Sequence, residues 1–167
     1  EGCRWPIHGC LTRAEAIRAA GGFDTRLAVG EDYLLWLEVA SQGPIVRVAE
    51  VLAQYRHHDG VQATKNLVRA ALDTLRAKQI FLGHHPETRR DLGKDKIRAL
   101  TWGRLIQTGN ALYWRGNIEA ARPLFRKALL AGQGTWSDRA RMLPSLFPLT
   151  LHQRISRSGR PGTGSTA

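Results

Sequence analysis

Residues 21–37, with the sequence GGFDTRLAVGEDYLLWL, decide how the first part of the chain is interpreted. The paired glycines end a short helix expected over residues 12–20, where Thr12 and Glu15 form a capping-box pattern. A loop follows the glycines. Residues 31–41 predict a second helix, because large apolar side chains crowd this run and two acids occupy its first turn, where they complement the helix dipole.

Two short strands are expected after this helix. Ile45–Val48 alternates apolar and polar residues, as a half-buried strand does, and Val51–Tyr55 is a second short apolar run. Two short strands and two short helices cannot form an independent core. Residues 1–64 are therefore predicted to be an incomplete α/β segment. Because the chain starts with Glu1 rather than Met, we expect a fragment trimmed at its N-terminus.

The rest of the chain predicts helices alone. Apolar residues recur at helical spacing over residues 62–82, 94–115, 117–131 and 136–143. Within this part, five residues are spaced as in a tetratricopeptide helix pair, namely Gly109, Gly116, Ala121, Phe125 and Ala128. We therefore expect an α/β segment (1–64), an all-α region with one such helix pair (65–150), and a flexible Gly/Ser/Arg-rich tail (151–167).

Composition narrows the class of protein. With 43% apolar and 23% charged residues the chain can fold around a core, and no apolar run is long enough to span a bilayer. Cys3 and Cys10 are too few for a disulfide framework, which fits a reducing cytoplasm. The net charge of +11 favours polyanions, yet no basic stripe interleaved with aromatic residues is present. We therefore expect no nucleic-acid partner.

Three short signatures occur in order: GGFD at 21–24, GEDYLLWL at 30–37 and YRHH at 55–58. Together they resemble the C-terminal half of the catalytic domain of family 2 glycosyltransferases, which have the GT-A fold. The resemblance covers residues 1–64. It implies a transferase that moves a sugar, with inversion, from a nucleotide-diphosphate donor to an acceptor hydroxyl in polysaccharide or glycolipid synthesis.

The sequence departs from the family pattern in two ways. Thr25 and Leu34 stand where the family often has acids. More importantly, nothing in the chain resembles the nucleotide-binding half of these enzymes with its acidic DxD metal motif. We therefore expect the fragment alone to be inactive, and the main ligands of a divalent metal cofactor (Mn or Mg) to lie in that other half.

The resemblance assigns the general base to Asp32. An inverting transfer needs one carboxylate to take the proton from the acceptor hydroxyl as its oxygen attacks the anomeric carbon. Glu31 would stand beside Asp32 and orient the acceptor or the Asp32 carboxylate. The alternative is that both acids only complement the dipole of their helix.

Five further residues are candidates for the site. In the resemblance, His58 matches the histidine that can complete the metal site or contact the diphosphate. Arg56 can pair with a phosphate through two N–H groups of its guanidinium. The alternative is that both are solvated loop residues. Tyr33 and Trp36 can stack on a sugar ring, although packing in the core is the favoured role of Trp36. His8 can reach a ligand on the acceptor side, with a buried structural histidine as the alternative.

A second class of function stays open beside the enzyme. The chain can instead be a non-enzymatic helical interaction module with a vestigial glycosyltransferase segment. If it is the enzyme, the acceptor is a carbohydrate or a lipid-linked molecule, and the basic helical region lies against anionic lipid. We accordingly expect a cytoplasmic protein, peripheral at the membrane.

Overall fold

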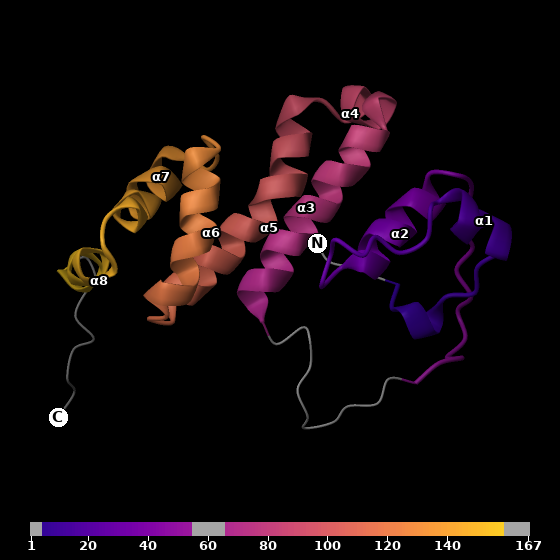
Figure 1. Ribbon diagram of the computed structural model, residues 1–167, viewed down its shortest axis with the longest axis horizontal. Coiled ribbons are helices and arrows are strands. Elements are labelled where there is room, and N and C mark those ends of the chain that lie inside the picture. The colour runs from indigo at the N-terminus through magenta and orange to yellow at the C-terminus, as the bar shows by residue number, and fades with distance from the viewer. Residues whose placement is uncertain (1–4, 55–65, 159–167) are drawn as a thin grey trace. The chain divides into compact units, whose positions relative to one another are not determined.

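The computed structural model describes residues 5–54 and 66–158 (Figure 1). In chain order its helical elements are η1 (Ile7–Gly9), α1 (Ala14–Ala19), α2 (Glu31–Ala40), α3 (Leu67–His84), α4 (Pro86–Leu92), α5 (Lys94–Trp114), α6 (Ile118–Leu130), α7 (Trp136–Met142), η3 (Leu143–Leu146) and α8 (Leu149–Ser158), where η marks a 3-10 helix.

The predicted α/β class is wrong, because none of the described residues lies in a strand and the fold is all-helical. Residues 45–54, which cover the described part of both predicted strands, are irregular and exposed; Val51 is 90% exposed. The alternation of apolar residues is real, but a strand also needs a neighbour to accept its backbone hydrogen bonds. No described segment pairs with this one.

The helix that follows Gly30 is confirmed, since α2 covers Glu31–Ala40. The capping box expected for the first helix is not formed. α1 begins at Ala14, and its N-cap Arg13 makes no side-chain cap. Glu15 instead pairs with Arg18 at 3.3 Å, one turn further along the helix. A capping box is present at the start of α7, where Thr135 and Asp138 cap each other's backbone.

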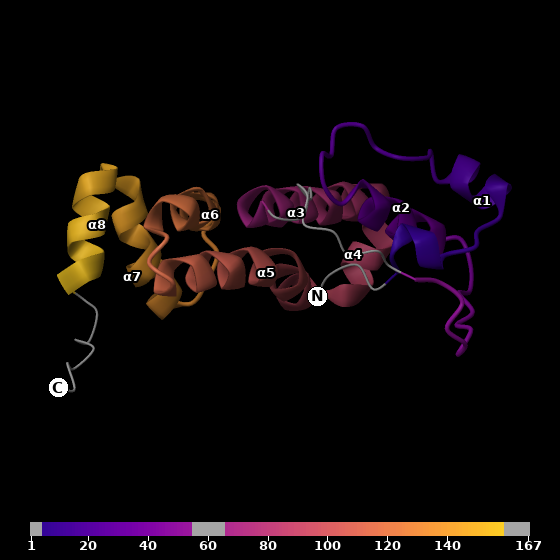
Figure 2. The same ribbon diagram turned by 90° about the horizontal axis from the view of Figure 1, so that it is seen from below.

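The described structure divides into two compact units, Glu1–Thr101 and Trp102–Ala167. In the first unit α2 packs against both α3 and α1, and Figures 1 and 2 both show α2 lying beside α3. Its core cluster contains Leu27, Leu34 and Ala77. The sequence pattern assigns α3 to the helical region after residue 64, but the apolar face of α3 serves the core of the first unit.

The second unit is organised around α6, which contacts α7, η3 and α8. Leu124, Phe125 and Ala128 of α6 are fully buried. A Cβ atom at Gly109 would lie only 2.8 Å from the Phe125 ring, so α5 and α6 approach as closely as the small residues of the predicted helix pair allow. α8 continues to Ser158, within the part of the chain that composition assigns to a flexible tail.

Across the described ranges, no helix combines the length and the apolar character that crossing a membrane requires.

Candidate functional site

Asp32 lies in the first turn of α2, at a helix end that has no side-chain cap. The N-cap residue is Gly30, whose φ of 84° is left-handed, a conformation that glycine adopts without strain. Asp32 itself accepts a hydrogen bond through Oδ1 from the backbone N–H of Tyr33, at 2.7 Å. This bond satisfies one of the amides that a helix start leaves without a partner. It also holds the carboxylate of Asp32 at the positive end of the helix.

The Asp32 carboxylate is partly exposed, and among the described residues no cation forms an ion pair with it. A base must reach its substrate and must not be held by a cation. In the described structure the Asp32 side chain is neither buried in the interior nor paired with an arginine. Glu31, immediately before it, is also partly exposed.

The segment around Cys10 lies close to Asp32. Burial raises the pKa of the Cys10 thiol, and the negative charge of Asp32 raises it further, which puts the two side chains within electrostatic range. The thiol donates to the carbonyl of Pro6 at 3.4 Å, so it closes the turn that carries η1. His8 projects from this turn and is exposed, which disfavours the buried structural role that the sequence left open.

The two aromatic candidates differ in their surroundings. Trp36 is only 6% exposed in the core of the first unit, so its ring has no open face for a sugar, and the packing interpretation is favoured. Tyr33 is partly buried against the cluster of Leu27, Leu34 and Ala77, and the ammonium group of Lys78 lies 5.8 Å from its ring centroid. Tyr33 therefore joins α2 to α3.

The YRHH candidates cannot be placed, because Arg56 and His58 lie outside the described residues. Within the described ranges, no group of three or more His, Cys, Asp or Glu side chains is arranged to hold a metal ion. The divalent metal therefore stays a prediction, and no described residue is assigned to it.

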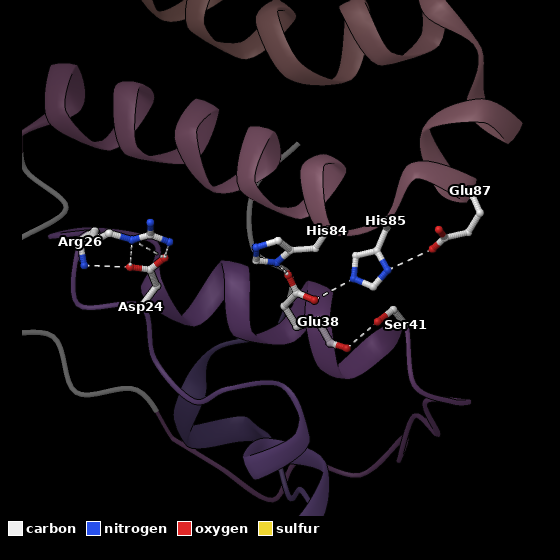
Figure 3. Close-up of polar contacts among 7 residues, drawn as sticks. All are labelled: Asp24, Arg26, Glu38, Ser41, His84, His85 and Glu87. Atoms are coloured by element: carbon white, nitrogen blue, oxygen red, sulfur yellow. Dashed lines mark hydrogen bonds and ion pairs between the residues drawn. The ribbon is translucent and has the colours of Figure 1, made fainter.

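The loop that carries the GGFD signature is held by charged side chains (Figure 3). Arg26 donates to both carboxylate oxygens of Asp24, the shortest distance being 2.6 Å, and this bonding lowers the pKa of Asp24 to about 2. Further along the loop, the backbone N–H of Val29 donates to the buried carboxylate of Asp73 in α3, at 3.3 Å. The same carboxylate accepts from Arg69 at 2.7 Å. These contacts fix the loop that leads into Asp32.

A histidine–carboxylate cluster joins the other end of α2 to α3 and α4, as Figure 3 shows. The two carboxylate oxygens of Glu38 bond to His84 Nδ1 at 2.8 Å and to His85 Nε2 at 2.7 Å. The second ring nitrogen of His85 faces Glu87 at 3.2 Å. The bond to Glu38 raises the pKa of His85 against the opposing effect of burial, and Glu87 adds to the rise.

Sequence reasoning gives this cluster no role. His84 and His85 stand just before Pro86, where they read as the end of a helix, and Glu38 is 46 positions away from His84. The adjacent histidines are the one signal available in the sequence. Their partner is known only once α2 and α3 are seen to pack together.

The second unit contains a histidine in contrasting surroundings, without the carboxylate partners that His85 has. His152 is fully buried, and neither of its ring nitrogens has a hydrogen-bond partner among the described residues. Its ring stacks on Tyr113, with centroids 6.4 Å apart. Burial lowers the pKa of His152, and the positive charge of Arg122 lowers it further. His152 is thus a neutral part of the core.

Comparisons of this chain with protein-family models, with curated proteins and with solved structures found no match.

Proposed function

We propose that this chain is the acceptor-side part of an inverting glycosyltransferase of the family 2 type, with Asp32 as its general base. The observation that carries the proposal is the state of Asp32: a partly exposed carboxylate, oriented by one backbone amide and bound by no described cation. It stands in the middle of the three ordered signatures from residue 21 to residue 58.

In the proposed reaction Asp32 removes the proton of the acceptor hydroxyl. The freed oxygen attacks the anomeric carbon of the donor sugar, and the bond from that carbon to the nucleotide diphosphate breaks. The Tyr33 amide holds one carboxylate oxygen of Asp32, so the other can face the hydroxyl. Glu31 is the adjacent acid that orients the acceptor, and His8 contacts it from the η1 turn.

The donor site belongs to residues that this chain does not supply, and a divalent metal, when bound, would neutralise charge on the departing diphosphate. None of the steps assigned to the described residues passes through that metal. The acceptor in this proposal is a carbohydrate or a lipid-linked molecule, and the enzyme works in the cytoplasm.

The proposal is tested by sugar transfer from a panel of nucleotide sugars, using the protein at its natural length. Asp32→Asn should lower turnover by roughly 100-fold or more, because a general base contributes on that order. The amide oxygen of the new side chain can still accept from the Tyr33 N–H, so the variant should fold. Asp95→Asn, in the first turn of α5, is the matched control and should leave turnover unchanged.

Near-normal turnover of Asp32→Asn would remove Asp32 from the mechanism. If no nucleotide sugar supports transfer by the natural-length protein, the enzyme proposal itself fails. Circular dichroism of each variant separates a lost base from a lost fold.

A helical interaction module is the second candidate, favoured by the all-helical structure of the described residues and by the burial of Trp36. It predicts partner binding that no nucleotide sugar affects. Titration of the natural-length protein with nucleotide sugars, followed by calorimetry, distinguishes the two candidates.

A further inference from the structure

Positive charge is concentrated in the second unit. Residues 102–167 contain ten Arg and Lys residues against two acids, a net charge of +8. Residues 1–101 contain fifteen basic residues against twelve acids, a net charge of only +3. The smaller unit therefore carries most of the excess charge, and it attracts anionic surfaces much more strongly than the first unit does.

The C-terminal segment of this unit has both buried and exposed apolar side chains. Met142, Ser145 and His152 are fully buried and face the core around α6. Four other apolar side chains are 40–51% exposed: Leu143 in η3, Phe147 just after it, and Leu151 and Ile155 one turn apart in α8. Single exposed apolar residues are ordinary on a protein surface, but four within residues 143–155 form an exposed apolar group.

Exposed tryptophans with arginines against their rings lie in the same unit. Trp136, at the start of α7, is 86% exposed, and the Arg139 guanidinium lies 5.7 Å from its ring centroid. Trp114, at the end of α5, is 55% exposed and has Arg141 at 5.5 Å. Each pair combines an amphipathic indole with a fixed positive charge.

We infer that the second unit binds the surface of an anionic phospholipid membrane. The exposed apolar group (Leu143, Phe147, Leu151 and Ile155) and Trp136 would enter the boundary between headgroups and acyl chains, while the arginines remain at the level of the lipid phosphates. Exposed apolar side chains, exposed indoles and excess positive charge are the combination that such an interface recognises. The inference concerns residues after 101 and does not depend on the role of Asp32.

Two other partners fit fewer of these observations. A nucleic acid would use the charge and the tryptophans, but it offers no apolar phase for Leu143, Leu151 and Ile155. A second copy of the chain would cover the exposed apolar group, but it would bring a second basic unit against the first. An anionic membrane offers both an apolar phase for the exposed apolar side chains and negative charge for the arginines.

The test is flotation of the full chain with two kinds of vesicle, pure phosphatidylcholine and phosphatidylcholine mixed with phosphatidylglycerol. We expect binding to the anionic vesicles to be at least about tenfold tighter, and to weaken as salt is raised. Tryptophan emission should shift to shorter wavelength on binding, because Trp136 leaves water.

Matched variants locate the contact. Leu151→Ser and Trp136→Ala should each weaken vesicle binding several-fold, whereas Leu52→Ser, an exposed apolar residue of the first unit, should have no effect. Arg154→Ser should reduce the preference for anionic vesicles, and Arg89→Ser, exposed in α4, should not. Asp32→Asn should bind vesicles as the unchanged chain does, so this inference and the glycosyltransferase proposal can fail separately.

Several results would overturn the inference. Equal binding to both kinds of vesicle would show that the chain does not recognise anionic lipid. Equal losses in the Leu52→Ser control would show that the second unit is not the contact. Tighter binding to a single-stranded oligonucleotide, unchanged by Leu151→Ser, would indicate a nucleic acid. Self-association in sedimentation without vesicle binding would indicate a second copy. If Leu151→Ser alters the circular dichroism spectrum, the Trp136→Ala and Arg154→Ser results decide.

Discussion

The two units use histidine in opposite ways. In the first unit both ring nitrogens of His85 face carboxylates, and the pKa of His85 is raised. In the second unit His152 is buried beside Tyr113 with no described polar partner, and its pKa is lowered. The same side chain is a hydrogen-bonded link between carboxylates in one unit and a core residue without a described polar partner in the other. The surroundings, rather than the residue type, decide the charge.

This difference predicts opposite responses to pH. The stabilisation from His85 is fully present below the ordinary histidine pKa of 6.5, and it is lost as the pH rises through the higher pKa of the folded state. The pKa of His152 is lower in the folded state than in the unfolded chain, so on acidification the unfolded chain binds a proton before the folded state does. The second unit therefore loses stability as the pH falls below 6.5.

The largest effect is expected from the core of the second unit. Phe125→Ala should cost about 3–5 kcal/mol, because it empties a fully buried site where the ring fills the space above Gly109. Denaturant unfolding followed by tryptophan fluorescence measures the loss. If the variant unfolds with the midpoint of the unchanged chain, the Phe125 ring does not anchor the core of the second unit.

A smaller effect is expected from the histidine–carboxylate cluster of the first unit. Glu38→Gln should cost about 1–3 kcal/mol near pH 6, because it weakens two charge-assisted hydrogen bonds to a carboxylate that is only 13% exposed. The cost should shrink above the folded-state pKa of His85, where the imidazole is neutral. Thermal unfolding measured over a range of pH gives both values.

Glu87→Gln is the matched control for that experiment. The Glu87 side chain is 61% exposed and contacts only one ring nitrogen of His85, at 3.2 Å. The loss should be clearly smaller than that of Glu38→Gln, because solvent screens an exposed ion pair. A loss as large as that of Glu38→Gln would mean that the contact between His85 and Glu38 is not the dominant one.

The smallest effect is expected at His152. His152→Leu should change stability by less than about 1 kcal/mol at pH 8, because it replaces a neutral ring whose nitrogens have no described partner. At pH 5 the variant should be the more stable protein, since the protonation of the unfolded chain no longer opposes folding. An unchanged acid limb in the stability profile would contradict the neutral core role of His152.

Much of the helical structure could be predicted from local pattern. The acids and apolar residues after Gly30 indicated α2 to within one residue at its C-terminal end, and the spacing of Gly109 and Phe125 indicated a close helix pair. The same kind of pattern predicted two strands within residues 45–55, but none of the described residues in this range lies in a strand. Helical hydrogen bonds lie within one segment, whereas a strand needs a second segment that its own sequence does not contain.

The candidate site divides in the same way. The position of Asp32 in the first turn of a helix follows from the sequence, and its glycosyltransferase role stays a prediction. Its proximity to Cys10 and the burial of Trp36 were seen only in the structure. The role of Arg56 and His58 stays a prediction as well, since both lie outside the described residues.

By itself the sequence determined where α2, α5, α6 and α7 begin and end, to within about one residue, because helical periodicity depends on residues close together in the chain. It did not predict α4 or α8. Tertiary structure alone decided that Glu38 meets His84 and His85, that α3 serves the core of the first unit, and that His152 is buried beside Tyr113. Those contacts join residues tens of positions apart, and their energies depend on the burial that packing creates.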